Sequence, residues 1–319
     1  MNILVTIPMD ESQKDRLSAI APEAEVVYCP ADQLTPDLLA QAEIILGNLP
    51  TDMIPYAAKL KWLQLNFAGS DNYCTPGLLP EDVLLTNATG AYGLAISECM
   101  LAGILYHIKR LGQYHDQQRK HLWRNCGEVR SIEGSVTLVV GLGDIGSSFA
   151  RRMNALGSTV FGIRRHVTEM PPYLAGLYTM DKLDELLPLA DYVALSLPNS
   201  PATRNVMNAA RFQRMKRDAI LINVGRGSAV DTDALVEALN SERIGGAVID
   251  VVHQEPLPEN HPLWEAKNLL LTPHVTGNFN LPETQRRVVD IVLRNLAAYL
   301  HGGEMVSVVD RSTGYRKFS

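Results

Sequence analysis

Short apolar runs alternate with helical patterns along the first hundred residues of the chain. The apolar runs predict β-strands at residues 2–7, 25–28, 43–46, 62–66 and 83–86. Helical patterns lie between several of them, at residues 36–42 and 52–59, with Thr51 as the expected N-cap of the second. Alternation of this kind predicts a parallel sheet with helices on both faces.

The same alternation returns after a long helical pattern at residues 94–111 and a polar stretch at 112–133. Strands are expected at 135–140, 158–163, 192–197, 219–224, 247–251 and 269–272, with a helix at 145–156 whose apolar residues share one face. A closing helix at 282–300 and a short strand at 305–309 follow. We predict two doubly wound α/β domains, one formed by residues 1–100 with 287–319 and the other by residues 101–286.

Composition narrows the class of protein. A length of 319 residues suits about two domains of roughly 100–200 residues each. The net charge of −6 argues against a nucleic-acid partner, and no apolar run approaches the roughly 20 residues of a membrane span. The segment Met1–Ile7 lacks the regions of a secretory signal. The scattered cysteines, with no C-x-x-C pair, favour reduced thiols over disulfides or a metal site, so we expect a cytoplasmic protein.

A glycine-rich turn stands between the strand at 135–140 and the helix at 145–156. Gly141 permits the tight turn, Gly143 lets the backbone approach a pyrophosphate, and Gly146 allows the helix to lie close to the strand. The start of the helix, at Asp144 and Ile145, offers N–H groups and a positive dipole end to phosphates. This context predicts a dinucleotide-binding site.

The end of the next strand indicates which dinucleotide is bound. NAD-binding proteins usually place Asp or Glu about 20 residues beyond the glycines, where it accepts hydrogen bonds from ribose hydroxyls. Here the strand ends in Arg164 and Arg165, two guanidiniums that suit a 2′-phosphate. The alternative is a solvated basic loop. We predict that NADP is preferred, with NAD as the second choice.

Three chemically distinct residues follow three predicted strands. Arg226 follows the strand at 219–224, Glu255 lies beyond the strand at 247–251, and His274 comes directly after the strand at 269–272. Ligands of open α/β sheets bind outside the carboxyl ends of strands. Arginine can bind a carboxylate and polarise a carbonyl, histidine can exchange a proton, and glutamate can hold that histidine protonated. The trio predicts hydride transfer between nicotinamide and a small 2-oxo or 2-hydroxy acid.

These residues resemble the D-isomer-specific 2-hydroxyacid dehydrogenase family. The likeness runs through nearly the whole chain and is most specific at Asn223–Asp231, Gly246–Leu257 and Thr272–Gly277. It implies that Arg226 is the substrate arginine, Glu255 the assisting glutamate and His274 the acid/base histidine. It also implies a flavodoxin-like substrate domain and a Rossmann domain with the active site in the cleft between them.

Further contacts are carried over from the same resemblance. Ala68, Gly69 and Ser70 resemble the family's substrate loop, whose backbone N–H groups meet the substrate carboxylate; the alternative is a plain turn after a strand. Asn48 and Tyr92 are expected to shape the pocket. The resemblance implies that Asp250 holds the nicotinamide carboxamide. It places these further residues at the cofactor: Leu197, Pro198, Val224 and Gly277. The family is usually dimeric through its nucleotide domain, so we expect a homodimer that uses residues 94–111 and the Trp123 segment.

Several departures from the family pattern bear on the substrate. Phe67 and Asn199 differ from the commoner residues at their positions, and Arg164 replaces a common acidic residue, as in NADPH-using glyoxylate and hydroxypyruvate reductases. We therefore expect an NADP-preferring reductase of glyoxylate or hydroxypyruvate. The alternatives are a dehydrogenase of a bulkier 2-oxo acid or of 3-phosphoglycerate, and a non-catalytic nucleotide-sensing regulator. A phosphorylated substrate needs extra basic residues near the cleft, and the sequence does not place Lys59, Lys61 or Arg311 there.

Overall fold

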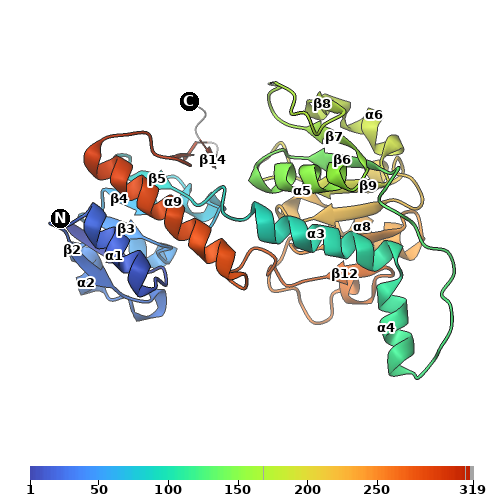
Figure 1. The fold of residues 1–319 in the computed structure, drawn as a ribbon, viewed down its shortest axis with the longest axis horizontal. Coiled ribbons are helices and arrows are strands. Elements are labelled where there is room, and N and C mark those ends of the chain that lie inside the picture. The colour runs from blue at the N-terminus through green and yellow to red at the C-terminus, as the bar shows by residue number, and fades with distance from the viewer. Residues whose placement is uncertain (168, 313, 317–319) are drawn as a thin grey trace. The chain divides into compact units, whose positions relative to one another are not determined.

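The computed structural model describes residues 1–167, 169–312 and 314–316, and it divides the chain into two compact units. Unit 1 comprises Met1–Tyr92 and Phe279–Ser319, and unit 2 comprises Gly93–Asn278 (Figure 1). The sequence predicts that the chain passes from one domain to the other after residues 100 and 286, positions that fall inside helices α3 (Gly93–Ile108) and α9 (Pro282–His301). In the structure the chain passes between units before each of these helices begins, because each helix packs as a whole within one unit.

Unit 1 contains a five-stranded parallel sheet in the order β2-β1-β3-β4-β5, the strand order of flavodoxin-like folds. Its strands and remaining helices are β1 (Asn2–Val5), α1 (Glu11–Ile20), β2 (Glu25–Tyr28), α2 (Pro36–Gln41), β3 (Ile44–Leu46), β4 (Trp62–Gln64) and β5 (Leu84–Thr86). A small antiparallel hairpin, β13 (Val309–Asp310) with β14 (Tyr315–Arg316), follows α9.

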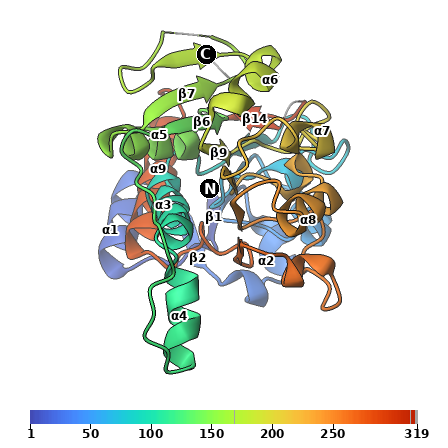
Figure 2. The same cartoon turned by 90° about the vertical axis from the view of Figure 1, so that its right-hand side faces the viewer.

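Helices cover both faces of the sheet in unit 1. Figure 2 shows α1 and α9 on one face and α2 on the other. A capping box between Asp10 and Gln13 begins α1, and Thr35 with Pro36 at the first position begins α2. An ion pair of 2.8 Å between Arg16 and Asp290 links α1 to α9. The sheet therefore lies in a three-layer α/β sandwich, as the alternation predicts.

Unit 2 contains a seven-stranded parallel sheet in the order β12-β11-β10-β9-β6-β7-β8. The chain reverses direction across the sheet between β6 and β9, which is the switch point of a Rossmann fold. Its strands are β6 (Val136–Val140), β7 (Thr159–Ile163), β8 (Gly176–Tyr178), β9 (Tyr192–Leu195), β10 (Ile220–Asn223), β11 (Gly246–Ile249) and β12 (Leu269–Leu271). Its further helices are α4 (Leu111–Arg119), α5 (Asp144–Ala155), α6 (Leu183–Leu186), α7 (Ala209–Phe212) and α8 (Thr232–Asn240).

The central strands of unit 2 are buried on both sides. Every residue of β9, β10 and β11 is buried, because α3 and α5 cover one face of the sheet and α7 and α8 the other (Figure 2). Continuous apolar strands of this kind are typical of parallel sheets. The predicted fold class, two parallel-sheet α/β domains, is confirmed.

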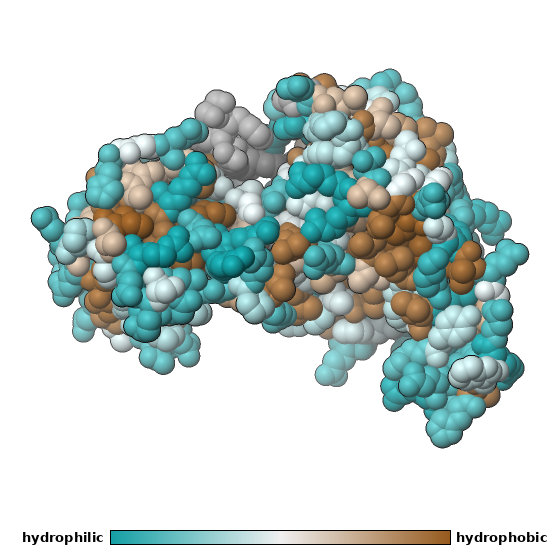
Figure 3. All heavy atoms as spheres, in the orientation of Figure 1, coloured by the Kyte–Doolittle hydropathy of each residue, from teal (hydrophilic) through white to brown (hydrophobic). Residues whose placement is uncertain are grey.

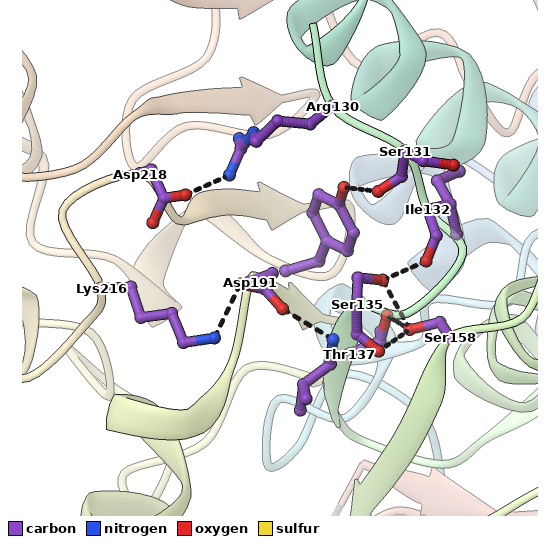
Figure 4. A network of polar contacts seen from close by, with 11 residues as sticks. Arg130, Ser131, Ile132, Ser135, Thr137, Ser158, Asp191, Lys216 and Asp218 are labelled. Atoms are coloured by element: carbon purple, nitrogen blue, oxygen red, sulfur yellow. Dashed lines mark hydrogen bonds and ion pairs between the residues drawn. The ribbon is translucent and has the colours of Figure 1, made fainter.

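An arm, formed by α4 and the segment that returns from it to β6, projects from unit 2 where the sequence pattern predicts a polar stretch. Helix α4 has no buried residue, and the chain returns from its end to β6 in an extended segment (Figure 1). The base of the arm is anchored, since Lys109 Nζ donates to the Arg130 carbonyl and the Arg130 guanidinium pairs with Asp218 at 2.7 Å. Figure 4 shows this ion pair. The Tyr192 hydroxyl donates to the carbonyl of Ser131, in the segment that leads to β6.

Two predicted elements of unit 1 are wrong in type or extent. The segment predicted as a helix at 52–59 forms a 3₁₀-helix over Thr51–Tyr56, because Pro55 has no N–H to donate within an α-helix. The strand predicted at 305–309 is instead β13, which begins only at Val309. Among the described residues, no helix is long and apolar enough to cross a membrane.

Candidate active site

The predicted catalytic residues lie beyond the carboxyl ends of three adjacent strands of unit 2. Arg226 follows β10, Glu255 follows β11 and His274 follows β12. The strands are neighbours in the order β12-β11-β10 and all run parallel, so their carboxyl ends share one edge of the sheet. The topology therefore brings the three loops together at that edge.

The imidazole of His274 and the carboxylate of Glu255 are hydrogen-bonded. Nδ1 of His274 lies 2.7 Å from Oε2 of Glu255, and the other carboxylate oxygen, Oε1, accepts the backbone N–H of Val252 at 3.0 Å. The His274 side chain is 51% exposed, which leaves the imidazole accessible to a substrate. Because Nδ1 is engaged by the carboxylate, Nε2 is the ring atom available for proton exchange.

Arg226 lies in a tight loop that is held by a buried asparagine. Asn223, which is fully buried at the end of β10, donates from Nδ2 to the Arg226 carbonyl at 3.0 Å and accepts the Gly225 N–H at 3.2 Å. A Cβ on Gly227 would lie 1.9 Å from the backbone of Val252, so only glycine allows this loop to approach the loop after β11. Asn223 and Gly227 thus fix the backbone from which the guanidinium extends.

The glycine turn has the geometry that its spacing predicts. A Cβ on Gly146 would lie 1.9 Å from the carbonyl oxygen of Gly141, so glycine is required where α5 meets β6. Ser196 Oγ donates to the same carbonyl at 2.6 Å. No described atom lies within 4 Å of where a Cβ of Gly143 would stand, which leaves the backbone there open to a ligand. The turn leads directly into the amino end of α5, at Asp144.

Asp144 and Ile145 are the first two residues of α5. The first turn of a helix has N–H groups without intrahelical acceptors, and these groups fit phosphate oxygens. The Asp144 carboxylate itself is used within the protein, where it accepts the N–H of Gly93 at 2.8 Å. The side chain of Asp144 therefore connects α5 to the start of α3, and its backbone N–H is the group that suits the ligand.

The remaining predicted cofactor residues border the same edge of the sheet. Arg164 and Arg165 directly follow β7, and the Arg164 N–H donates to the Tyr178 carbonyl at 3.0 Å. Leu197 and Pro198 follow β9; Leu197 is buried, and the Pro198 carbonyl accepts the Thr203 hydroxyl at 2.7 Å. Two further residues, Val224 after β10 and Gly277 in the loop after β12, complete the set.

Asp250 follows β11, and the loop after β12 that carries His274 folds around its side chain. Its side chain is buried, with 4% exposure, and its carboxylate accepts hydrogen bonds from four groups of the segment 272–276. Sequence reasoning did not identify the two threonines, Thr272 and Thr276, that donate two of these bonds. No motif signals them, because their role depends on how two loops meet in space.

The predicted substrate loop of unit 1 follows β4. Ala88 N–H donates to the Phe67 carbonyl and Asn87 Nδ2 to the Ala68 carbonyl. Within the described ranges, the backbone N–H groups of three residues have no protein acceptor: Ala68, Gly69 and Ser70. N–H groups without a protein acceptor on a braced loop can bind a carboxylate. The side chain of Phe67 is 47% exposed beside them.

Asn48 and Tyr92 brace this loop. Asn48 Oδ1 accepts the Asn66 N–H at 3.0 Å, and the buried Tyr92 hydroxyl donates to the Asn66 carbonyl. Burial raises the pKa of the Tyr92 hydroxyl, so it remains a donor at neutral pH. The structure shows both residues bonded to the loop backbone, and their part in shaping a pocket stays a prediction.

Comparison with known proteins agrees with this arrangement. The model of the D-isomer specific 2-hydroxyacid dehydrogenase NAD binding domain matches residues 101–276, more than half of the chain. The chain is 30% identical to glyoxylate/hydroxypyruvate reductase B of Enterobacter sp. (strain 638) over 276 residues, 83% of this chain and 84% of that protein.

Two solved structures share the architecture across nearly the whole chain. A D-isomer specific 2-hydroxyacid dehydrogenase family protein from Aeromonas salmonicida has a TM-score of 0.87 at 28% identity, covering 97% of this chain and 99% of that one. An NADPH-dependent glyoxylate/hydroxypyruvate reductase from Sinorhizobium meliloti, in complex with NADP and sulfate, has a TM-score of 0.82 at 27% identity, covering 98% and 99%. The strand-end residues, the glycine turn and these similarities lead to one conclusion: the chain belongs to the D-isomer specific 2-hydroxyacid dehydrogenase family.

Proposed function

We propose that this protein reduces a small 2-oxo acid to its D-2-hydroxy acid, with NADPH as the preferred hydride donor. The single observation that carries the proposal is the hydrogen bond of 2.7 Å between His274 and Glu255, next to the loop of Arg226 at one edge of the sheet. A histidine held by a carboxylate is a proton donor, and an arginine binds carboxylates. Both are required for reduction of a 2-oxo acid.

Each residue has a defined part in this proposal. Arg226 of unit 2 binds the substrate carboxylate and polarises the carbonyl. In unit 1, the N–H groups of residues 68–70 are the proposed carboxylate-binding groups. His274 donates a proton from Nε2 to the carbonyl oxygen, and Glu255 stabilises the protonated imidazole. Bound nicotinamide supplies the hydride. In the opposite direction, His274 accepts the proton of the hydroxyl group.

The proposed nucleotide is NADP, with NAD as the second choice. The open backbone at Gly143 and the N-terminus of α5 suit a pyrophosphate. Arg164 and Arg165 stand where the adenosine ribose of a dinucleotide is expected, and guanidiniums favour a 2′-phosphate there. The Sinorhizobium meliloti structure, which contains NADP, supports the same nucleotide.

The proposed substrate class is glyoxylate or hydroxypyruvate. The similarity to two glyoxylate/hydroxypyruvate reductases supports it. The alternative of 3-phosphoglycerate needs basic groups for the phosphate, and the Arg311 guanidinium is engaged elsewhere, donating to the carbonyls of Leu79, Pro80 and Glu81. A bulkier 2-oxo acid is the main alternative substrate. Phe67, whose exposed ring lies beside the proposed substrate loop, is the residue that leaves the size of the acid open. A nucleotide-sensing regulator without turnover is the remaining alternative.

We further propose that the arm of unit 2 binds a second copy of the chain. Residues 109–124 of the arm carry five basic side chains and one acidic side chain, which gives the segment a net charge of +4. Because the whole chain has a net charge of −6, the remainder carries −10. The same segment exposes apolar side chains, above all Trp123, which is fully exposed. Figure 3 shows apolar surface where α3 and α5 lie, and Leu111 and Leu156 are exposed apolar side chains of unit 2. A basic, aromatic arm and an acidic remainder are complementary between copies.

A cytoplasmic location completes the proposal. All four cysteines are unpaired thiols, in agreement with a reducing compartment.

The proposal is tested by measuring oxidation of NADPH and NADH by the purified protein with glyoxylate, hydroxypyruvate, phenylpyruvate and 3-phosphohydroxypyruvate. The expected result is faster turnover with NADPH and with the two smallest acids. Preference for phenylpyruvate or for the phosphorylated acid would favour the corresponding alternative. Nucleotide binding without turnover of any acid would favour the regulator.

A further inference from the structure

Both oxygens of the Asp250 carboxylate accept hydrogen bonds from the loop that follows β12. Oδ1 accepts the Thr272 hydroxyl at 2.6 Å and the Val275 N–H at 3.0 Å. Oδ2 accepts the Thr276 hydroxyl at 2.5 Å and the Thr276 N–H at 3.4 Å. An ionised carboxylate offers about four acceptor positions, and the loop uses three of them at ordinary hydrogen-bond distances.

The main chain of Asp250 contributes a further bond to the same loop. Its carbonyl accepts the N–H of His274 at 2.8 Å, and this N–H also lies 3.1 Å from the Thr272 carbonyl. One residue at the end of β11 therefore holds the backbone on both sides of His274. The burial of Asp250, at 4% exposure, excludes water from competing for these donors.

His274 itself has a backbone conformation that needs such support. Its φ angle is +53°, in the left-handed region that non-glycine residues rarely adopt. Conformations of this kind persist only where the surroundings determine them. The hydrogen bonds between Asp250 and the loop hold His274 in this conformation, in which its imidazole meets Glu255.

We propose that Asp250 is a positioning residue for His274: its buried carboxylate organises residues 272–276 so that the imidazole meets Glu255. This inference rests on the proposed function and gives Asp250 a part in addition to the direct contact with the nicotinamide carboxamide that family resemblance implies.

The test compares Asp250→Asn with two milder variants, Thr276→Val and Thr272→Val. In Asp250→Asn the amide NH₂ faces at least one backbone N–H, so the loop loses an acceptor. Each threonine variant removes one donor and leaves the charge and the backbone bonds in place. The matched control is Asp191→Asn, in which a carboxylate that accepts the Val136 N–H is lost at the amino end of β9.

The readouts are kcat, the KM of the 2-oxo acid, the NADPH Kd and amide hydrogen exchange of residues 272–276. For Asp250→Asn we expect kcat at saturating NADPH to fall about tenfold or more and exchange of the loop to rise. The threonine variants should lower kcat by a smaller factor in the same direction. Asp191→Asn should leave kcat and exchange of this loop unchanged.

Two results would overturn the inference. One is NADPH Kd weakened about tenfold with kcat preserved at saturating NADPH, which is the behaviour of a direct cofactor contact. The other is unchanged exchange of residues 272–276 in both Asp250→Asn and Thr276→Val. If the wild-type protein reduces no 2-oxo acid, the proposed function fails, while hydrogen exchange and NADPH Kd still decide the role of Asp250.

Discussion

Nδ1 of His274 lies 2.7 Å from Oε2 of Glu255, although the two residues follow different strands and are 19 positions apart in the chain. The carboxylate is itself held in place, because its other oxygen accepts the N–H of Val252. The orientation of the imidazole is thus determined by a fixed partner. The proposed proton donor, His274, depends on this hydrogen bond, and substitution of Glu255 tests it.

Glu255→Gln should lower kcat for reduction of a 2-oxo acid by about tenfold, since a hydrogen bond between charged groups contributes roughly 1.5–3 kcal/mol and both side chains are partly exposed. Steady-state kinetics at saturating NADPH measures the effect. Glu259→Gln, which alters an exposed carboxylate in the same segment, is the matched control. Equal kcat values for the two variants would remove Glu255 from the mechanism.

Arg226→Lys should raise the KM of the 2-oxo acid by about tenfold or more while NADPH Kd changes little, because lysine keeps the charge but loses the planar pair of donors. Initial rates over a range of acid concentrations give KM, and a fluorescence titration gives Kd. A variant with the wild-type KM would place the carboxylate-binding group elsewhere.

The double variant Arg164→Asp with Arg165→Ala should shift the ratio of kcat/KM for NADPH over NADH toward NADH by about tenfold or more, because it removes two cations and supplies an acceptor for ribose hydroxyls. Arg217→Ala serves as the control, since Arg217 precedes β10 and lies toward the amino end of the sheet. An unchanged ratio in the double variant would show that these arginines form only a solvated loop.

The arm prediction concerns the oligomeric state. Lys120→Glu with Arg124→Glu, combined with Trp123→Ala, should convert a dimer to a monomer, because the charge complementarity and the exposed aromatic anchor are lost together. Sedimentation velocity measures the change. Trp264→Ala removes another exposed tryptophan of the same unit and should leave the dimer intact. A wild-type protein that sediments as a monomer would contradict the proposal.

His107 makes stability depend on pH. Burial lowers the pKa of its imidazole, and Nε2 donates to the Ala247 carbonyl at 3.0 Å. The folded protein therefore binds the proton less readily than the unfolded chain, whose histidine has a pKa of about 6.5. The full stability is present above that value and declines as pH falls below it, through the folded pKa.

Urea unfolding of the wild type and of His107→Gln, at pH 7 and near pH 5.5, tests this expectation. The loss of unfolding free energy on acidification should be smaller in the variant, because the titrating group is gone. His115→Gln changes an exposed histidine on the arm and should keep the wild-type pH dependence. An identical loss in wild type and His107→Gln would show that other groups dominate acid destabilisation.

The parts of the fold that depend on local sequence could be predicted. Gly141 has a positive φ and Gly146 leaves no room for a Cβ, so both positions of the turn require glycine, and the buried strands of unit 2 are mostly apolar runs. His274 could also be located from local sequence, because it follows an apolar strand pattern and therefore lies at the carboxyl edge of the sheet. These features require no knowledge of distant contacts.

Other features depend on contacts that no local pattern signals. Helix α4 could not be predicted from periodicity, because it buries no residue and therefore has no apolar stripe. The donors Thr272 and Thr276 acquire their role only when the loop after β12 folds over Asp250. Asn223 reads as the end of a strand, yet it is fully buried and holds the arginine loop.

The central claim is that His274 delivers the proton in reduction of a 2-oxo acid. The most direct measurement is the rate of NADPH oxidation at saturating nucleotide and acid by the wild type, His274→Ala and the neighbouring control His253→Ala. We predict turnover by the wild type and by His253→Ala, and a rate roughly 100- to 10,000-fold lower for His274→Ala with unchanged NADPH affinity. A His274→Ala variant as fast as the wild type, or a wild type that binds NADPH and reduces no 2-oxo acid, would contradict the account.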